Sequence, residues 1–200
     1  MNYLVQYDKI LILMGRTKCF NREEVLDRAI QVFWRQGFAN TSLHDLEQAT
    51  GVNKSGLYSE FKDKEDLFCQ SIKRYKETNL VAEILTKQPL GYENVENFLK
   101  SSLNCSGEKG CYLANTMREL SFLPHQVKKL ILENVASVAE LLLMNLKAVS
   151  NRNDLDQFVS MILTFSTGIS LKLNAMKPKE VEPEIDFFSK NFKKLILDEE

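Results

Sequence analysis

Two short amphipathic patterns separated by a single glycine, within residues 37–67, constrain the fold of this chain more than any other feature. Their apolar residues are Leu43, Leu46 and Ala49 in the first pattern, and Leu57 and Phe61 in the second. Spacings of three and four residues place these side chains on one face of a helix. Gly51 ends the first helix, because glycine adopts the left-handed conformation of a tight helix terminus without steric cost. The segment therefore predicts a helix-turn-helix.

The second of these helices has a polar side that suits contact with DNA. Asn53 is a good cap for it. Lys54, Ser55 and Tyr58 lie opposite its apolar face. A recognition helix enters the major groove with its N-terminal residues, and phosphates bind to Lys, Ser and Tyr side chains and to helix N-terminal amides. The candidate DNA-binding residues are Thr41, Ser42, Lys54, Ser55, Gly56, Tyr58, Lys62 and Lys64, together with Arg16 and Lys18 ahead of the first helix.

A long ungapped set of residues around this segment resembles the N-terminal signature of the TetR/AcrR family of one-component transcriptional regulators. The matching residues are Gly37, Phe38, Thr41, Ser42, Leu43, Asp45, Leu46, Gly51, Val52, Leu57, Tyr58, Phe61, Lys64, Glu65 and Leu67. The pattern departs at two positions: Glu47 stands where a small alanine is usual, and Thr50 where alanine or methionine is frequent. Both residues suit the surface or the end of a helix. A continuous match of this length is far more specific than a lone glycine between two helices.

The resemblance implies a homodimeric repressor that binds double-stranded operator DNA with an inverted repeat and releases it when a small-molecule effector enters the helical body. It also implies that a helix beginning at Asp63 joins the DNA-binding head to the body, and that its N-terminus, with Lys64, touches the DNA backbone. The candidate residues for lining the effector pocket are Tyr75, Phe98, Tyr112, Asn115, Met117, Met144 and Phe165. The apolar side chains among them equally suit ordinary core packing. No cofactor is expected, and the effector and the operator sequence are left open.

The composition is that of an all-α protein. Only 8 glycines and 4 prolines occur in 200 residues, which favours long helices with short connections, and 44% apolar residues supply a core. We expect about nine helices, divided into an N-terminal extension (residues 1–14), a helix-turn-helix DNA-binding domain (15–68) and an effector-binding and dimerisation domain (69–200). The net charge is only −1, with 26 Lys and Arg against 27 Asp and Glu. Affinity for DNA must therefore come from a local patch of cations.

The second half of the chain is predicted to be a helical body with breaks at glycine and proline. The expected helices cover residues 93–104, 125–149, 155–173 and 184–197. The helix of residues 155–173 is apolar around much of its circumference, so more than one neighbour must bury it. In the resembling family the last two helices pair with those of a second copy. Homodimerisation through the last two helices is therefore expected here.

The N-terminal segment does not suggest export or membrane insertion. No run of residues approaches the roughly 20 apolar residues of a membrane span. The apolar stretch of residues 10–14 is too short for the core of a signal peptide, and Gly15 and Arg16 follow it in place of a cleavage site. The protein is therefore expected to be cytoplasmic. We expect Met14 to be the natural start, with residues 1–13 an upstream extension; the alternative is an additional helical turn that packs on the domain.

Four cysteines without a secretory signal predict reduced thiols. Cys19 and Cys69 are expected to be small buried apolar residues. Cys111 stands at the expected start of a helix with Lys109 and Arg118 nearby, and a helix N-terminus and adjacent cations both favour a reactive thiolate. An alternative function is therefore a repressor that senses oxidants or electrophiles through Cys111. The simpler interpretation is a packed, unreactive cysteine.

An enzyme is not expected from this sequence. The two histidines, His44 and His125, lie far apart and have no cysteine or carboxylate at the spacing of metal ligands. No nucleophile elbow, phosphate-binding loop or dinucleotide-binding glycine motif occurs. A further alternative is a helical interaction dimer whose head does not bind DNA.

Overall fold

The computed structural model describes residues 20–104 and 110–197, and over these ranges the only regular elements are helices. They contain ten α-helices: α1 (Arg22–Asn40), α2 (Leu43–Thr50), α3 (Lys54–Glu60), α4 (Lys64–Thr78), α5 (Val81–Thr86), α6 (Tyr92–Ser101), α7 (Tyr112–Thr116), α8 (His125–Lys147), α9 (Leu155–Lys172) and α10 (Pro178–Leu197). Two 3-10 helices, η2 (Ser102–Asn104) and η3 (Met117–Glu119), follow α6 and α7. The predicted all-α fold is confirmed. The expected extension, residues 1–14, lies outside the described ranges.

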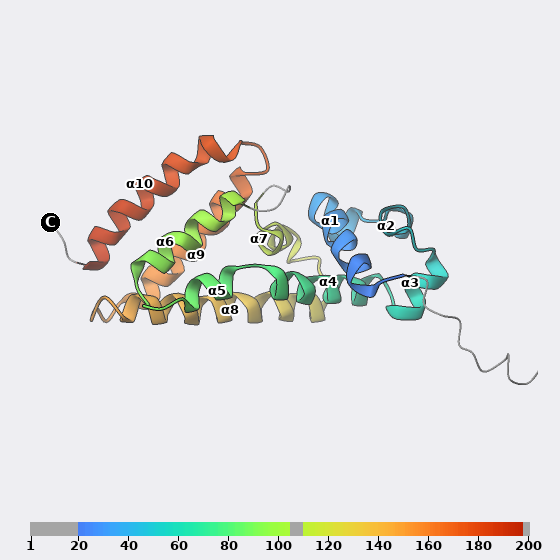
Figure 1. The fold of residues 1–200 in the computed structure, drawn as a ribbon, viewed down its shortest axis with the longest axis horizontal. Coiled ribbons are helices and arrows are strands. Elements are labelled where there is room, and N and C mark those ends of the chain that lie inside the picture. The colour runs from blue at the N-terminus through green and yellow to red at the C-terminus, as the bar shows by residue number, and fades with distance from the viewer. Residues whose placement is uncertain (1–19, 105–109, 198–200) are drawn as a thin grey trace, which may run out of the picture.

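The helices form an elongated molecule with the helix-turn-helix at one end (Figure 1). α1, α2 and α3 lie at that end, and α6, α9 and α10 lie toward the other. α8 runs along the molecule and contacts both α4 and α5. α4 in turn packs extensively on α1. α4 and α8 therefore connect the two ends.

α1 begins after a side-chain cap. The Asn21 side chain caps it by accepting a hydrogen bond from the Glu23 amide at 2.9 Å. The inner stripe of this helix, Val25, Ala29, Val32 and Phe33, is buried. Regular helical geometry is interrupted at Gly37, whose φ of +79° lies in the left-handed region. Gly37 therefore redirects the chain toward α2.

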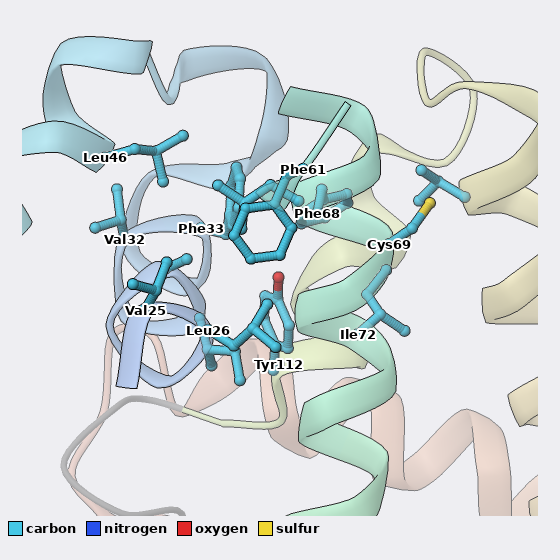
Figure 2. Close-up of a cluster of buried hydrophobic side chains, with 14 of the residues drawn as sticks. Val25, Leu26, Val32, Phe33, Leu46, Phe61, Phe68, Cys69, Ile72 and Tyr112 are labelled. Carbon is cyan, nitrogen blue, oxygen red and sulfur yellow. The ribbon is translucent and has the colours of Figure 1, made fainter. Parts of the chain in front are cut away.

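The first core packs the helix-turn-helix against the body. Apolar residues of α1 to α4 meet Tyr112 of α7 and Val127 of α8 there. Figure 2 shows the centre of this cluster, with Phe33 and Phe68 above Tyr112. The rings of Phe33 and Phe68 meet edge to face with centres 4.6 Å apart. α4 runs without a break across the boundary expected between residues 68 and 69, so the two expected domains share a helix and a core.

The second core lies among α5, α6, α8, α9 and α10 and surrounds one fully buried amide, that of Asn145 on α8. The Asn145 nitrogen donates to the Leu85 carbonyl at 2.7 Å. Its oxygen accepts hydrogen bonds from the Asn94 side chain at 2.8 Å and from the Gly91 amide at 3.0 Å. Because a buried polar group must be hydrogen-bonded to be tolerated, this network holds the connection between α5 and α6 on α8.

Two helices differ from the sequence expectations. α5, with six residues, is too short to give a periodic pattern that would predict it. α7 begins directly after Cys111, where a helix start is expected. α10 begins at Pro178 and not at residue 184. Proline is tolerated in the first turn of a helix, where its missing N–H would have no partner. Pro183, directly before the expected start, is accommodated inside the helix.

Two glycines with a left-handed backbone have different surroundings. Gly51 has a φ of +72° and Gly110 a φ of +71°. A Cβ added to Gly110 would lie 2.2 Å from the carbonyl oxygen of Ser170 on α9, whereas a Cβ on Gly51 would meet nothing within 4 Å. Gly110 therefore lets the chain before α7 press against the backbone of α9.

We expect Gly110→Ala to destabilise the protein much more than Gly51→Ala. Both substitutions impose a left-handed conformation on alanine, which costs about 1–2 kcal/mol. Gly110→Ala adds an overlap with a backbone carbonyl, so its loss of unfolding free energy should exceed that of Gly51→Ala by at least about 1 kcal/mol. Urea denaturation followed by circular dichroism measures both losses. Equal losses would contradict the close approach of Gly110 to α9.

Candidate nucleic-acid interface and adjoining cavity

α2 begins with a capping box. The Ser42 hydroxyl and amide both donate to the Asp45 carboxylate, at 2.6 and 2.8 Å, and the Asp45 amide donates to the Ser42 hydroxyl oxygen at 3.2 Å. The bond from the Ser42 hydroxyl, followed by that from its amide, holds the pKa of Asp45 below its usual value. Gly51 ends α2 in the left-handed conformation, as the sequence predicts. The first helix of the pair is thus defined at both ends.

The start of α3 is fixed by side chains from the turn and from α2. The Asn53 side-chain oxygen caps α3 by accepting a hydrogen bond from the Gly56 amide at 2.9 Å. The Glu47 carboxylate accepts another from the Lys54 amide. Close packing explains why position 56 is a glycine, since a Cβ there would lie 2.6 Å from Cγ1 of Val52. The residue that was expected to contact DNA therefore keeps α3 close to the preceding turn.

The solvent side of α3 carries three of the expected DNA contacts. Lys54, Ser55 and Tyr58 are exposed, while the apolar side of the helix is buried. The Lys54 ammonium lies 5.8 Å from the centre of the Tyr58 ring, which brings a cation beside a phenol. We call these three residues the α3 surface. Two further exposed candidates, Ser42 and Lys62, belong to the segments that flank α3.

Two of the expected DNA contacts, the buried Thr41 and the half-buried Lys64, use their polar groups within the protein. Thr41 is 1% exposed, and its hydroxyl donates to the Gly37 carbonyl at 2.6 Å. The Lys64 ammonium donates to the carbonyls of Phe38 and Thr41, both at 2.9 Å. Burial lowers the pKa of Lys64 from its usual value. The structure corrects the expectation for Thr41 and Lys64: both hold the connection between α1 and α2, and their polar groups are used inside the protein.

The N-terminus of α4 offers less to a phosphate than the sequence suggested. Asp63 caps α4 by accepting a hydrogen bond from the Asp66 amide at 2.8 Å. The Asp66 carboxylate accepts one from the Lys62 amide at 3.0 Å, and Glu65 adds a further anion. These carboxylates occupy amides and repel a DNA backbone, so the exposed positive charge here comes from the Lys62 side chain. The remaining candidates, Arg16 and Lys18, lie outside the described residues.

A carboxylate from the body reaches the connection between α1 and α2. Glu119, at the end of η3, accepts a hydrogen bond from the Ala39 amide at 3.0 Å. Gly37 makes room for this contact, since a Cβ there would lie 1.6 Å from a Glu119 carboxylate oxygen. Sequence reasoning missed Glu119 because its partner lies 80 residues away, and no local pattern signals the pairing.

A cavity of about 1130 Å³, which we call the central cavity, lies between the helix-turn-helix and the body. Of the residues expected to line an effector pocket, Tyr75, Phe98 and Met117 do so. Cys111 lines it as well. Trp34 of α1 is a further lining residue, not predicted because an aromatic on an amphipathic helix is indistinguishable from a core residue. The central cavity therefore touches α1, the helix that precedes the helix-turn-helix, directly.

Three of the other expected pocket residues lie elsewhere. Tyr112 is fully buried in the first core, where its hydroxyl lies 2.9 Å from the Ser71 hydroxyl and burial raises its pKa. Asn115 accepts a hydrogen bond from Asn174 at 2.6 Å. Met144 is 51% exposed on α8. These residues correct the expectation, because helical periodicity separates inside from outside but does not separate core from cavity.

The two cysteines in the described part of the chain have different surroundings. Cys69 is buried; this burial, with a smaller effect of the Glu65 carboxylate, raises the pKa of its thiol to about 11. Cys111 is half-buried immediately before α7, and its sulfur accepts a hydrogen bond from the Tyr75 hydroxyl at 3.8 Å. The candidate sensor thiol therefore belongs to the cavity wall. Cys19 and Lys109 lie outside the described residues.

A groove of about 490 Å³ between α9 and α10 exposes apolar side chains. Phe165, which was expected in the effector pocket, lines this groove and stacks on Phe188 with ring centres 3.8 Å apart. The exposed fractions of Phe187, Leu195 and Met161 are 73%, 58% and 48%. We call this feature the α9–α10 groove. Gathered apolar side chains of this exposure are typical of a surface that another protein covers.

The groups that the described residues bring together are suited to binding. No three His, Cys, Asp or Glu side chains of this part of the chain come together as a metal site requires. None of the described helices is both long and apolar enough to cross a membrane. What the geometry offers is an exposed α3 surface with a lysine and two hydroxyls, and a large cavity that α1 lines in part.

Comparison with known proteins agrees with this arrangement. Residues 25–70 match the family model described as bacterial regulatory proteins, tetR family. The HTH-type transcriptional repressor ComR of Escherichia coli (strain K12) is 33% identical over 114 residues, 54% of this chain and 54% of ComR. The uncharacterized HTH-type transcriptional regulator YezE of Bacillus subtilis (strain 168) is 33% identical over 118 residues, 56% of this chain and 60% of YezE. The matches thus span somewhat more than half the length of these curated relatives.

Solved structures share the fold over most of the chain. A cysteine mutant of the TetR family transcriptional regulator CifR, complexed with 26bp double-strand operator DNA, superposes with a TM-score of 0.76 over 88% of this chain and 98% of that chain, at 18% identity. At this identity the likeness concerns the fold alone. Together with the family match and the two curated relatives, it shows that residues 25–70 carry the helix-turn-helix of the tetR family of bacterial regulatory proteins, in a chain that shares the fold of a TetR family regulator.

Proposed function

We propose that this protein is a transcriptional repressor that binds operator DNA through the α3 surface and releases it when a small-molecule effector enters the central cavity. The observation that carries the proposal is the exposure of Lys54, Ser55 and Tyr58 on the second helix of the helix-turn-helix. ComR, a similar protein, is an HTH-type transcriptional repressor, and a CifR mutant was solved with operator DNA. In this proposal residues 15–68 are the DNA-binding domain and residues 69–200 the effector-binding and dimerisation domain.

A few cations supply the DNA affinity in this proposal. The net charge of −1 means that no long-range field draws the protein to DNA. Lys54, in the first turn of α3, is placed for base edges, because the N-terminal residues of a recognition helix enter the groove. Lys62 follows α3 and is placed for a phosphate. Sequence preference and general affinity therefore depend on different lysines.

The central cavity is positioned to control the helix-turn-helix. Met117 lines it, and Glu119, at the other end of the same 3-10 helix, accepts the hydrogen bond of the Ala39 amide. An effector that favours one position of η3 therefore shifts the carboxylate that holds the connection between α1 and α2. A difference of about 1–3 kcal/mol in effector binding between the DNA-competent and DNA-incompetent states gives a useful response.

The homodimer in this proposal forms through the α9–α10 groove. An isolated chain leaves its apolar side chains in water, whereas a second copy of the same face buries both. Ile169 and Ser170, on the other side of α9, are 3% and 1% exposed and face the interior of their own chain. Two DNA-binding ends joined in this way bind half-sites whose centres lie about 34–36 Å apart, or a multiple of that distance.

A second candidate function is a thiol-based repressor, favoured by the position of Cys111 on the cavity wall. An electrophile that enters the central cavity would meet this sulfur beside the Tyr75 hydroxyl. The thiolate attacks the electrophilic carbon, a sulfur–carbon bond forms, and the displaced electron pair takes up a proton. The effector is then held covalently, and release from DNA is no longer reversible by dilution.

The first test concerns the lysines of the DNA interface. Lys62→Ala should weaken binding to operator and to unrelated DNA alike, because a phosphate contact carries no sequence information. The slope of log K against log salt concentration should decrease in magnitude by about 0.9, the value for one phosphate. Lys64→Ala should leave that slope unchanged and lower the unfolding free energy by about 1–3 kcal/mol, because it loses two internal hydrogen bonds.

Fluorescence anisotropy over a salt series measures the slopes. Lys129→Ala on α8, where the side chain is 67% exposed, is the matched control and should change neither slope nor stability. A slope that Lys62→Ala does not alter would remove Lys62 from the interface. If the unsubstituted protein binds no DNA, the helical interaction dimer becomes the better interpretation.

The second test concerns the dimer. Phe187→Asp should give a folded monomer. The Phe187 side chain is 73% exposed in the single chain, so a charge there does not disturb the fold. A dimer through the α9–α10 groove would bury that charge without a partner, so the dimer should not form. Phe122→Asp, at a side chain that is 86% exposed outside the α9–α10 groove, should remain dimeric. Sedimentation velocity distinguishes the two. A monomeric unsubstituted protein at micromolar concentration would contradict the dimer.

The third test concerns the thiol. N-ethylmaleimide should modify Cys111 much faster than Cys69, because Cys69 is buried and its pKa is raised to about 11. Modified protein should lose its DNA affinity, whereas Cys111→Ser should keep that affinity and ignore the reagent. Mass spectrometry locates the label and a gel shift follows DNA binding. Equal labelling rates, or intact DNA binding after modification of Cys111, would leave the reversible effector as the only regulator.

A further inference from the structure

The peptide group between Phe38 and Ala39, in the connection from α1 to α2, is hydrogen-bonded on both sides by charged side chains. Its carbonyl oxygen accepts a hydrogen bond from the Lys64 ammonium at 2.9 Å. Its N–H donates to the Glu119 carboxylate at 3.0 Å. Because the C=O and N–H of a trans peptide point in opposite directions, the cation and the anion lie on opposite sides of this group. We call this arrangement the Phe38–Ala39 clamp.

The two charges of the clamp reinforce each other through the peptide group. The negative end of the peptide dipole, the carbonyl oxygen, faces the ammonium, and the positive end, the N–H, faces the carboxylate. Hydrogen bonds with one ionised partner are roughly twice as strong as neutral ones, and linked hydrogen bonds polarise one another. Burial lowers the pKa of Lys64, and the Glu119 carboxylate acts against this lowering. Each charge is therefore stabilised in part by the other.

The clamp takes its two charges from different parts of the molecule. Lys64 is the first residue of α4, and Glu119 is the last residue of η3, which follows α7. The carboxylate reaches the connection only because position 37 is a glycine, since a Cβ there would overlap a carboxylate oxygen of Glu119. The clamp therefore fixes the connection between α1 and α2 against α4 and against η3 at once.

The clamped connection leads directly into the helix-turn-helix. The Lys64 ammonium also donates to the Thr41 carbonyl at 2.9 Å. The next residue, Ser42, caps α2. Glu47 on α2 in turn accepts the hydrogen bond of the Lys54 amide, in the first turn of α3. A displacement of the clamped peptide is thus passed to α2 and from there to the start of α3.

We propose that Glu119 is a positioning residue for operator recognition, which holds α2 and α3 in place through the Phe38–Ala39 clamp. This inference rests on the proposed function, because it names a residue outside the helix-turn-helix that sets how the α3 surface meets the operator bases. Hydrogen bonds to base edges weaken steeply when their distance or angle changes. Phosphate contacts from long, flexible side chains such as that of Lys62 tolerate a small displacement. Loss of the clamp should therefore reduce sequence discrimination more than general affinity for DNA.

The test replaces Glu119 by glutamine, which keeps an acceptor oxygen and removes the charge. The probes are a duplex that the unsubstituted protein selects from a random pool and a duplex of the same length with a shuffled sequence. In Glu119→Gln the ratio of the two affinities should fall about fivefold to tenfold, with an unchanged salt slope because no phosphate contact is lost. Removal of a negative charge would by itself raise the affinity for any DNA, so weaker binding of the selected duplex has the opposite sign.

The matched control is Glu133→Gln on α8. It removes the same charge from a side chain that is 56% exposed and pairs with Lys129, and it should leave the ratio of affinities unchanged. Lys64→Ala should lower the ratio as Glu119→Gln does. Because both residues act on one peptide group, the double variant should lose little more than the weaker of the two single variants, and not the product of their losses.

A spectroscopic measurement follows the clamp itself. The protein is isotope-labelled at alanine nitrogen, and the Ala39 amide signal is identified by its absence from Ala39→Ser. This resonance should move when a charged acceptor of the N–H is replaced by a neutral one. It should therefore shift in Glu119→Gln and in Lys64→Ala but not in Glu133→Gln. A general loss of stability does not produce this selective shift.

An unchanged affinity ratio in Glu119→Gln would overturn the inference. So would an equal loss in Glu133→Gln, or an Ala39 resonance that Glu119→Gln does not move. Thermal melting shows which variants are folded, and if Lys64→Ala is not, the ratio and the resonance in Glu119→Gln decide alone. A protein that binds no DNA fails the proposed function and this inference together, whereas sequence-specific binding with an unchanged ratio fails the inference only.

Discussion

The rest of the structure depends on the packing of the first core, which joins the helix-turn-helix to the body. Phe33 of α1 and Tyr112 of α7 pack there on Phe68 of α4, and the Phe68 and Tyr112 ring centres lie 6.1 Å apart. Protein interiors are close-packed and do not deform freely. The helix-turn-helix therefore has no free hinge at residues 68–69, and in the proposed repressor a signal from the body would have to move α1, α4 and α7 together. Small concerted shifts of packed helices suit this arrangement better than a swinging domain.

Two features connect α1 with the central cavity. Trp34 lines the central cavity from within α1, and Glu119 holds the connection that follows α1. One ligand beside Trp34 and Met117 would act on both contacts at once. Linkage then requires reciprocity: an effector that lowers DNA affinity by some factor must itself bind the DNA-bound protein more weakly by the same factor. In the proposed repressor, bound effector would thus weaken the binding of DNA, and bound DNA would weaken the binding of effector, without contact between the two ligands.

Features with a local cause could be predicted from the sequence. The Asn53 cap, the glycine end at Gly51 and the buried stripe of α1 all follow from spacings within one or two helical turns. The role of Lys64 could not, because its ammonium bonds the carbonyls of Phe38 and Thr41, more than 20 residues earlier in the chain. In the sequence it resembles any exposed lysine at a helix start. Only the fold distinguishes a lysine that meets a phosphate from one that closes a connection.

The cavity was the least predictable part of the candidate site. Tyr75 and Phe98 line it, whereas Tyr112, chosen by the same reasoning, fills the first core. Aromatic side chains on amphipathic helices face inward in either case, so periodicity cannot separate the two. Trp34 and Ser170 are distinguished instead by one buried polar atom each that has no hydrogen-bond partner among the described residues. An unmet hydrogen bond is a property of the surroundings in space and not of residue type or spacing, so a position marked in this way becomes visible only when the folded chain is known.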